Sequence, residues 1–180
     1  MSVPTLGSLL CVPALDRPDL LAPSVARALG AWPGGQRVSV TEIDPDLADT
    51  AALTEAYGLP LSASANCVVV SGRRAGEERV AACVVRADTR ADVNNLVKRT
   101  LDVRKASFLP MDRAVEETGM EYGGITPVGL PAPWRVLVDV SVRDIDVAVI
   151  GSGVRRSKLL LSGADLADLP RVEVLDELGI

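Results

Sequence analysis

The chain has 180 residues, of which 48% are hydrophobic but only 3% are aromatic, and its formal net charge is −5. This length suits one domain with a sizeable core built mainly from Val, Leu, Ile and Ala. The acidic balance argues against non-specific DNA binding, which needs many phosphate-neutralising cations. No apolar run approaches the roughly 20 residues of a membrane helix, and no basic segment precedes an apolar N-terminal stretch, so we expect a cytoplasmic protein.

The first half of the chain predicts helices and strands in alternation. In chain order we expect an irregular lead-in at 1–18, a helix at 19–31, a strand at 37–43, a helix at 46–57 and two strands at 64–71 and 79–87. Asp44 or Pro45 would open the second helix and Gly58 would end it. A polar loop, 72–78, would join the last two strands as a hairpin.

The second half continues the mixed order. We expect a helix at 91–102, a strand at 105–109, a helix at 111–119, strands at 134–142 and 145–150, a strand end at 159–161, a short helix at 164–168 and a final strand at 171–175. Thr89 with Asp92 approximates a capping box, and Pro110 and Gly119 bound the following helix. This order favours an α/β fold in which a mixed, partly barrel-like sheet is flanked by helices, over a doubly wound sheet. We interpret 1–180 as a single domain, with 1–36 as an N-terminal extension that carries a helix.

Several kinds of chemistry are absent from the sequence. There is no histidine, which removes Ser–His and Cys–His catalysis and histidine metal sites. Neither a P-loop nor a Rossmann glycine motif is present. Cys11, Cys67 and Cys83 form no C-x-x-C pair, which favours buried hydrophobic roles. We therefore expect no metal and no cofactor. Any catalysis would use backbone amides, hydroxyls, lysine, carboxylates or groups of the substrate itself.

Two glycine-rich segments stand out, Gly123-Gly124-Ile125-Thr126-Pro127-Val128-Gly129 and Gly151-Ser152-Gly153. Glycine permits positive φ and the close approach of a ligand, and exposed N–H groups in such turns can bind a carbonyl oxygen or an oxyanion. The alternative for each is a purely structural connection between elements. Arg155, Arg156 and Lys158 follow the second segment as a basic cluster, which is either part of a pocket or a solvated charge run.

Asn66 stands at the start of the apolar run 67–70, as a strand-end hydrogen-bonding group or as a polar group of a pocket. Lys98 and Lys105 are most simply interpreted as part of the solvated surface around the helix at 91–102.

Taken in order, these motifs resemble the YbaK/EbsC family, relatives of the editing domain that is inserted in bacterial prolyl-tRNA synthetases. The resemblance runs from about Val38 to Val174, and the G-G-x-[ST]-P-x-G segment at 123–129 is its most specific part. The other parts that carry it are Asp44-Pro45, the strands 67–70 and 80–85, the segment 92–105, Met111-Asp112, Gly151-Ser152-Gly153 and Arg155.

The resemblance implies a mixed, partly barrel-like sheet and hydrolysis, in trans and without metal, of the ester between a small mischarged amino acid and the tRNA 3′ end. Mischarged tRNA would be the substrate and an aminoacyl-tRNA synthetase a second partner, with no membrane and no DNA. The implied catalytic residues are Asn66, Gly124 and Ser152. The implied substrate-binding residues are Gly123, Ile125, Thr126, Pro127, Gly129, Gly151, Gly153, Lys98, Lys105 and Arg155.

Two positions depart from the family pattern. The family usually carries a lysine where this chain has Asn66, and often an acidic residue where this chain has Lys158. Asparagine can hydrogen-bond but brings no charge. Together these two differences would move a positive charge from one side of the pocket to the other. Lys98 and Lys105 are alternative sources of a positive charge. Two other functions therefore stay open: a non-catalytic binding module of the same fold, and a hydrolase of another small ester or amide.

Overall fold

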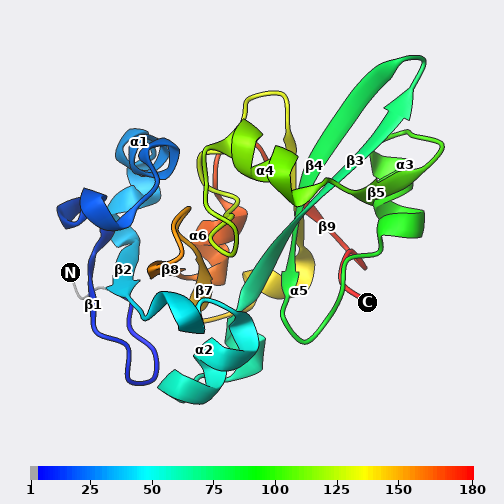
Figure 1. Cartoon of the computed structure of the whole chain (residues 1–180). Coiled ribbons are helices and arrows are strands. Elements are labelled where there is room, and N and C mark those ends of the chain that lie inside the picture. Colours follow the sequence, from blue (N-terminus) through cyan, green and yellow to red (C-terminus); the bar gives the residue numbers. More distant parts are fainter. Residues whose placement is uncertain (1–3) are drawn as a thin grey trace.

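Two β-sheets stand side by side in the computed structural model, which describes residues 4–180 (Figure 1). The first sheet is antiparallel and has the order β1 (Cys11–Pro13), β2 (Ser39–Glu42), β8 (Ser157–Leu161) and β7 (Ala148–Gly151). The second has the order β5 (Ala106–Phe108), β3 (Ala65–Arg74), β4 (Glu77–Arg86), β6 (Arg135–Asp139) and β9 (Val172–Leu175). Within it β4, β6 and β9 are parallel, and β5, β3 and β4 are antiparallel. The predicted mixed sheet with flanking helices is confirmed.

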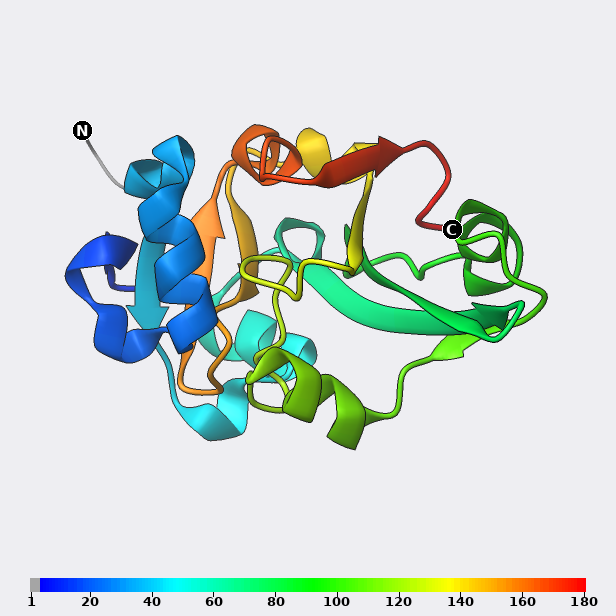
Figure 2. The same ribbon diagram turned by 90° about the horizontal axis from the view of Figure 1, so that it is seen from above.

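The sheets meet where β3 begins, because Ser64 forms an isolated parallel bridge to Val149 of β7. The helices around them are α1 (Pro23–Ala31), α2 (Thr50–Tyr57), α3 (Lys98–Thr100) after a π-helical turn at Val93–Val97, α4 (Met111–Thr118), α5 (Val140–Arg143) and α6 (Gly163–Ala167). Seen from above, α4 lies on the opposite side of the molecule from α5 and α6 (Figure 2).

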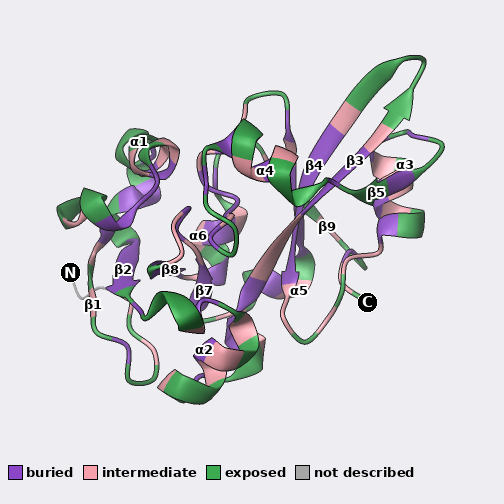
Figure 3. Cartoon of the chain, in the orientation of Figure 1, coloured by how far each residue is buried: buried purple, intermediate pink, exposed green. Residues whose placement is uncertain are grey.

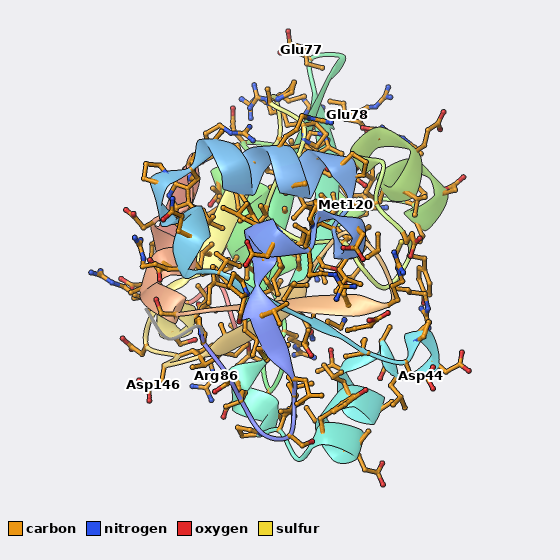
Figure 4. All side chains as sticks on the ribbon, turned by 90° about the vertical axis from the view of Figure 1, so that its left-hand side faces the viewer. Asp44, Glu77, Glu78, Arg86, Met120 and Asp146 are labelled. Atoms are coloured by element: carbon orange, nitrogen blue, oxygen red, sulfur yellow. The ribbon has the colours of Figure 1, made fainter. Side chains whose placement is uncertain are left out.

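The core is built on the two-residue period of β4. Val80, Ala82 and Val84 face one apolar cluster, and the alternate residues Ala81, Cys83 and Val85 face another. A strand buried on both faces is expected where helices cover a sheet with parallel neighbours. The outer end of the β3–β4 hairpin is exposed, however (Figure 3). Glu77 and Glu78 lie at that end, whereas Met120 lies inside the molecule (Figure 4).

Several predicted boundaries in the first half are wrong for identifiable reasons. The lead-in contains strand β1, and its residues 1–3 lie outside the described part. The first helix begins at Pro23 rather than at 19, since proline suits the first helical position. The helix at 46–57 is two elements, because the Asp49 carboxylate accepts the Ala51 N–H and starts α2 anew. The hairpin turn is only Ala75-Gly76, so the two strands run further than predicted.

Two boundaries in the second half also differ. Asp92, not Thr89, caps the helical segment, since its carboxylate accepts the N–H groups of Asn95 and Leu96. The predicted strand at 134–142 ends at Asp139, whose carboxylate accepts the Ser141 N–H and starts α5. The two strands β6 and β7, on either side of α5, belong to different sheets.

Candidate functional site

A cavity of about 380 Å³ lies where the two sheets meet. It is lined by residues of β3, β7 and β8 and by the ends of α2 and α4, with the first glycine-rich segment as another part of its wall. The polar or ionisable side chains of its lining are those of Asp49, Thr50, Ser64, Asn66, Cys67, Tyr122 and Lys158. This size is within the range of small-molecule sites in proteins.

Lys158 brings a buried positive charge to the cavity. It lies on β8 opposite Gly151 of β7 and is 7% exposed. Its Nζ donates to the Ala48 carbonyl at 2.8 Å and to the Gly123 carbonyl at 3.5 Å, so it joins the start of α2 to the glycine-rich segment. Burial and, to a smaller extent, the nearby Arg155 charge lower the pKa of Lys158 to about 8, an effect that Asp49 partly opposes. Because an ammonium group has three donors, Lys158 can also donate to a ligand.

Asn66 faces the same cavity from the other sheet. Its Oδ1 accepts a hydrogen bond from the Thr50 hydroxyl at 2.9 Å, so its NH2 group is oriented to donate. Ser64 is 3% exposed, and its Oγ has no hydrogen-bond partner within residues 4–180. Lys158, Asn66 and Ser64 thus bring donors to one small space. Such a cavity suits a ligand with acceptor oxygens, for example the carbonyl of an ester.

The two glycine-rich segments lie directly against each other. The Glu121 N–H donates to the Gly153 carbonyl at 2.9 Å, and the Gly153 N–H donates to the Gly124 carbonyl at 2.7 Å. A Cβ on Gly151 would lie 2.5 Å from the Gly124 carbonyl oxygen, closer than real Cβ atoms come. Glycine is therefore required at Gly151 by close approach of two backbones. Of the predicted residues in these segments, Gly123, Ile125 and Gly151 line the cavity.

Three other predicted residues of these segments lie behind this wall. The Gly124 N–H donates to the Glu121 carbonyl at 2.9 Å within its own turn. Ser152 is fully buried, and its Oγ hydrogen-bonds with Ser157 Oγ at 2.7 Å and with the Ser157 carbonyl at 3.0 Å. Thr126 is also fully buried. These three residues therefore support the wall of the first cavity from inside the protein and are not part of its lining.

The remaining predicted residues lie elsewhere. Pro127 and Gly129 line a second cavity, of about 260 Å³, beside α1. Gly153 has φ +86° and packs against Ala22. Lys98 begins α3, and Lys105 precedes β5 as an exposed residue.

Arg155 supports the rim of the first cavity. Its guanidinium carbon lies 5.8 Å from the centre of the Tyr122 ring, and Tyr122 is part of the lining.

Sequence reasoning missed several lining residues, among them Thr50, Ser64, Phe108 and Tyr122. Lys158 was named in the basic cluster and as a departure from the family pattern but not as a site residue, and the structure places it in the lining of the cavity. One available signal was the rarity of aromatic residues. Phe108 is the single phenylalanine of the chain, and it stands two residues before Pro110, which opens a helix. Within residues 4–180, no group of three His, Cys, Asp or Glu side chains is arranged to hold a metal ion. No helix in the described part is both long and apolar enough to cross a membrane.

Comparisons with known proteins agree with this arrangement. The chain is 29% identical over 129 residues to the uncharacterised protein YwhH of Bacillus subtilis strain 168, which covers 72% of this chain and 79% of that protein. It is 34% identical over 77 residues to a proline–tRNA ligase of Listeria welshimeri, covering 42% of this chain but only 13% of the ligase.

A solved structure, described provisionally as a trans-editing enzyme for prolyl tRNA synthetase, has the same fold, with a TM-score of 0.71 and 22% identity over 87% of this chain and 97% of that one. The family model of the aminoacyl-tRNA editing domain matches residues 44–169, which include α2, β3, the glycine-rich segments and Lys158. This chain therefore belongs to the aminoacyl-tRNA editing domain family.

Proposed function

We propose that this protein is a trans-acting deacylase that hydrolyses the ester between a small mischarged amino acid and the 3′ end of a tRNA. The observation that supports this most is the cavity, whose donor side chains Asn66 and Lys158 both lie in the part of the chain that the family model covers. Its volume of about 380 Å³ suits a small aminoacyl group better than a large ligand.

The proposed reaction uses the donors that face the cavity. The ester carbonyl accepts hydrogen bonds from Asn66 and Lys158, which stabilise the negative charge that develops on this oxygen as water adds to the carbonyl carbon. The bond between that carbon and the ribose oxygen then breaks. The proton lost by the attacking water passes, through the neighbouring ribose hydroxyl, to the leaving oxygen. The products are a free amino acid and an uncharged tRNA, and no histidine is needed.

The two departures from the family pattern compensate each other in this proposal. Asn66 on β3 is neutral where relatives usually carry lysine, whereas Lys158 on β8 is positive where they often carry an acid. The positive charge thus reaches the ester from the first sheet instead of the second. A charged donor stabilises an oxyanion about twice as strongly as a neutral one, so we expect Lys158 to contribute more than Asn66.

The test is deacylation of a panel of mischarged tRNAs, chiefly alanyl-, cysteinyl- and seryl-tRNA-Pro, by the wild type and by Asn66→Ala, Asn66→Lys and Lys158→Met variants. We expect wild-type turnover and a fall of roughly 100-fold in kcat for Lys158→Met, as for the loss of one oxyanion donor. Leu10→Ala is the control, since Leu10 is 89% exposed and lies in the lead-in. Absence of wild-type turnover on every substrate, with activity only in Asn66→Lys, would identify a binding module instead.

A further inference from the structure

The rim of the cavity carries two exposed aromatic side chains. The chain has only one Phe, two Tyr and two Trp. Trp32 and Trp134 are buried and Tyr57 is half-buried, whereas Phe108 and Tyr122 are 63% and 61% exposed. Both exposed rings line the cavity. An aromatic-poor chain therefore places two rings in water at one site, where it gives up the stabilisation that burial of a ring would bring.

The backbone holds Phe108 in this exposed position. Phe108 ends β5 and pairs with Val70 of β3, and the next N–H, that of Leu109, donates to the Val69 carbonyl at 2.8 Å. Leu109 is buried in the core, which fixes the backbone directly after Phe108, while the Phe108 ring stays exposed. The ring is thus presented by a rigid element. It is not the result of a loose loop.

Tyr122 follows α4 in the chain, whereas Phe108 precedes it, and contacts of the backbone and of Arg155 fix its position. The turn that contains it is closed by the hydrogen bond from the Gly124 N–H to the Glu121 carbonyl, and the Glu121 N–H is bound to Gly153. The guanidinium of Arg155 lies 5.8 Å from the centre of the Tyr122 ring and donates to the Tyr122 carbonyl at 3.5 Å. A positive charge therefore stands beside the second ring.

The composition of the rim indicates the class of ligand. Met111, which is 45% exposed, begins α4 and also lines the cavity, so the rim combines flat aromatic and apolar surface with a neighbouring guanidinium. Aromatic rings stack on nucleobases whatever the base, because every base has a π face, and arginine pairs with phosphate. A nucleotide has both of these parts, a base and a phosphate.

We propose that Phe108 and Tyr122 form a stacking site for the 3′-terminal nucleobase of the substrate, with Arg155 placed to bind the phosphate of that nucleotide. This inference rests on the proposed function. When the acyl group occupies the cavity, the terminal ribose lies at its mouth, and the base bonded to that ribose lies over the rim. The protein then recognises the terminal nucleotide of the single-stranded 3′ end as well as the amino acid attached to it.

The test is binding of a short, 5′-labelled single-stranded RNA that ends in CCA and carries no amino acid, compared with the same RNA whose 3′ residue lacks its base. We expect the wild type to prefer the first RNA, and Phe108→Ala and Tyr122→Ala to raise its Kd roughly 5- to 150-fold, the range for loss of one base–aromatic stack. Phe108→Trp keeps the stacking surface and should keep the affinity. Leu10→Ala is again the control, and a thermal melt of each variant checks that it is folded.

The outcomes separate this inference from the proposed function. Equal binding of the two RNAs by the wild type, or Kd values of Phe108→Ala and Tyr122→Ala within twofold of the wild type, would overturn the stacking site even if the protein hydrolyses mischarged tRNA. Base-dependent binding that both alanine variants lose would support it. If the same protein hydrolyses no aminoacyl-tRNA, the stacking site stands and the deacylase proposal fails. In an active enzyme we expect the alanine variants to raise KM more than they lower kcat.

Discussion

Replacement of Lys158 by methionine should stabilise the protein at neutral pH. In the folded chain Lys158 loses its proton near pH 8, whereas an unperturbed lysine keeps it to about 10.5. At pH 7 the buried ammonium therefore costs about 3 kcal/mol of folding free energy. Methionine removes this cost but leaves the Ala48 carbonyl without the 2.8 Å hydrogen bond, a loss of about 1 kcal/mol. The expected net gain is about 2 kcal/mol, or roughly 4–8 °C in Tm for a chain of this length.

The pH dependence distinguishes this mechanism from better packing. Between pH 8 and 10.5 the unfolded wild-type chain binds more protons than the folded one, so wild-type stability rises with pH relative to the variant. The stability gained by Lys158→Met should therefore fall to within about 1 kcal/mol of zero by pH 10. Thermal melts at pH 7 and pH 10 measure it, and Lys105→Met, which removes an exposed lysine, is the matched control. A gain of the same size at both pH values, or no gain at pH 7, would refute the reasoning.

Two further variants test the wall of the cavity and the end of β6. Gly151→Ala should lower both the Tm and the affinity for a cavity ligand, because its Cβ would lie 2.5 Å from the Gly124 carbonyl oxygen; melts and RNA binding measure the two effects. Asp139→Asn should destabilise the fold by about 1–3 kcal/mol, since the Asp139 carboxylate, 4% exposed, accepts the N–H groups of Ser141 and Gly179. Burial opposes ionisation of Asp139, but these hydrogen bonds lower its pKa, so the wild type should lose this stability as the pH falls through that lowered pKa and the variant should not; urea denaturation between pH 7 and pH 3 shows it.

Sequence reasoning succeeded where a local signal decides the structure. Pro110 and Gly119 bound α4 as expected, with Gly119 at φ +67°. The resemblance assigned residues of both glycine-rich segments to one pocket, but it did not predict the backbone contact between the two segments. The strand-to-helix change at Asp139 was missed, since the apolar run 136–138 continues as Val140 and Val142 and only the capping carboxylate interrupts it.

The cavity was harder to predict than the fold. Lys158 and Asn66 are 92 positions apart and belong to different sheets, so no spacing rule brings them together. Ser152 illustrates the opposite case. A serine between two glycines is typical of an exposed binding loop, yet its hydroxyl bonds with Ser157 inside the protein. Tertiary packing decided both outcomes, and it acts through contacts that are distant in the sequence.

The order β1-β2-β8-β7 has a consequence for biosynthesis. Ser39 of β2 pairs with Leu160 of β8, and the cavity needs β8 for Lys158 and β7 for its wall. Contacts between such distant segments form late and slowly, because a long loop must close before they stabilise anything. During translation, β3 and β4 can pair long before the first sheet exists, so an incomplete chain presents the exposed hairpin without the cavity. The ability to hold a ligand is therefore expected to appear only once the ribosome has released residues 157–161.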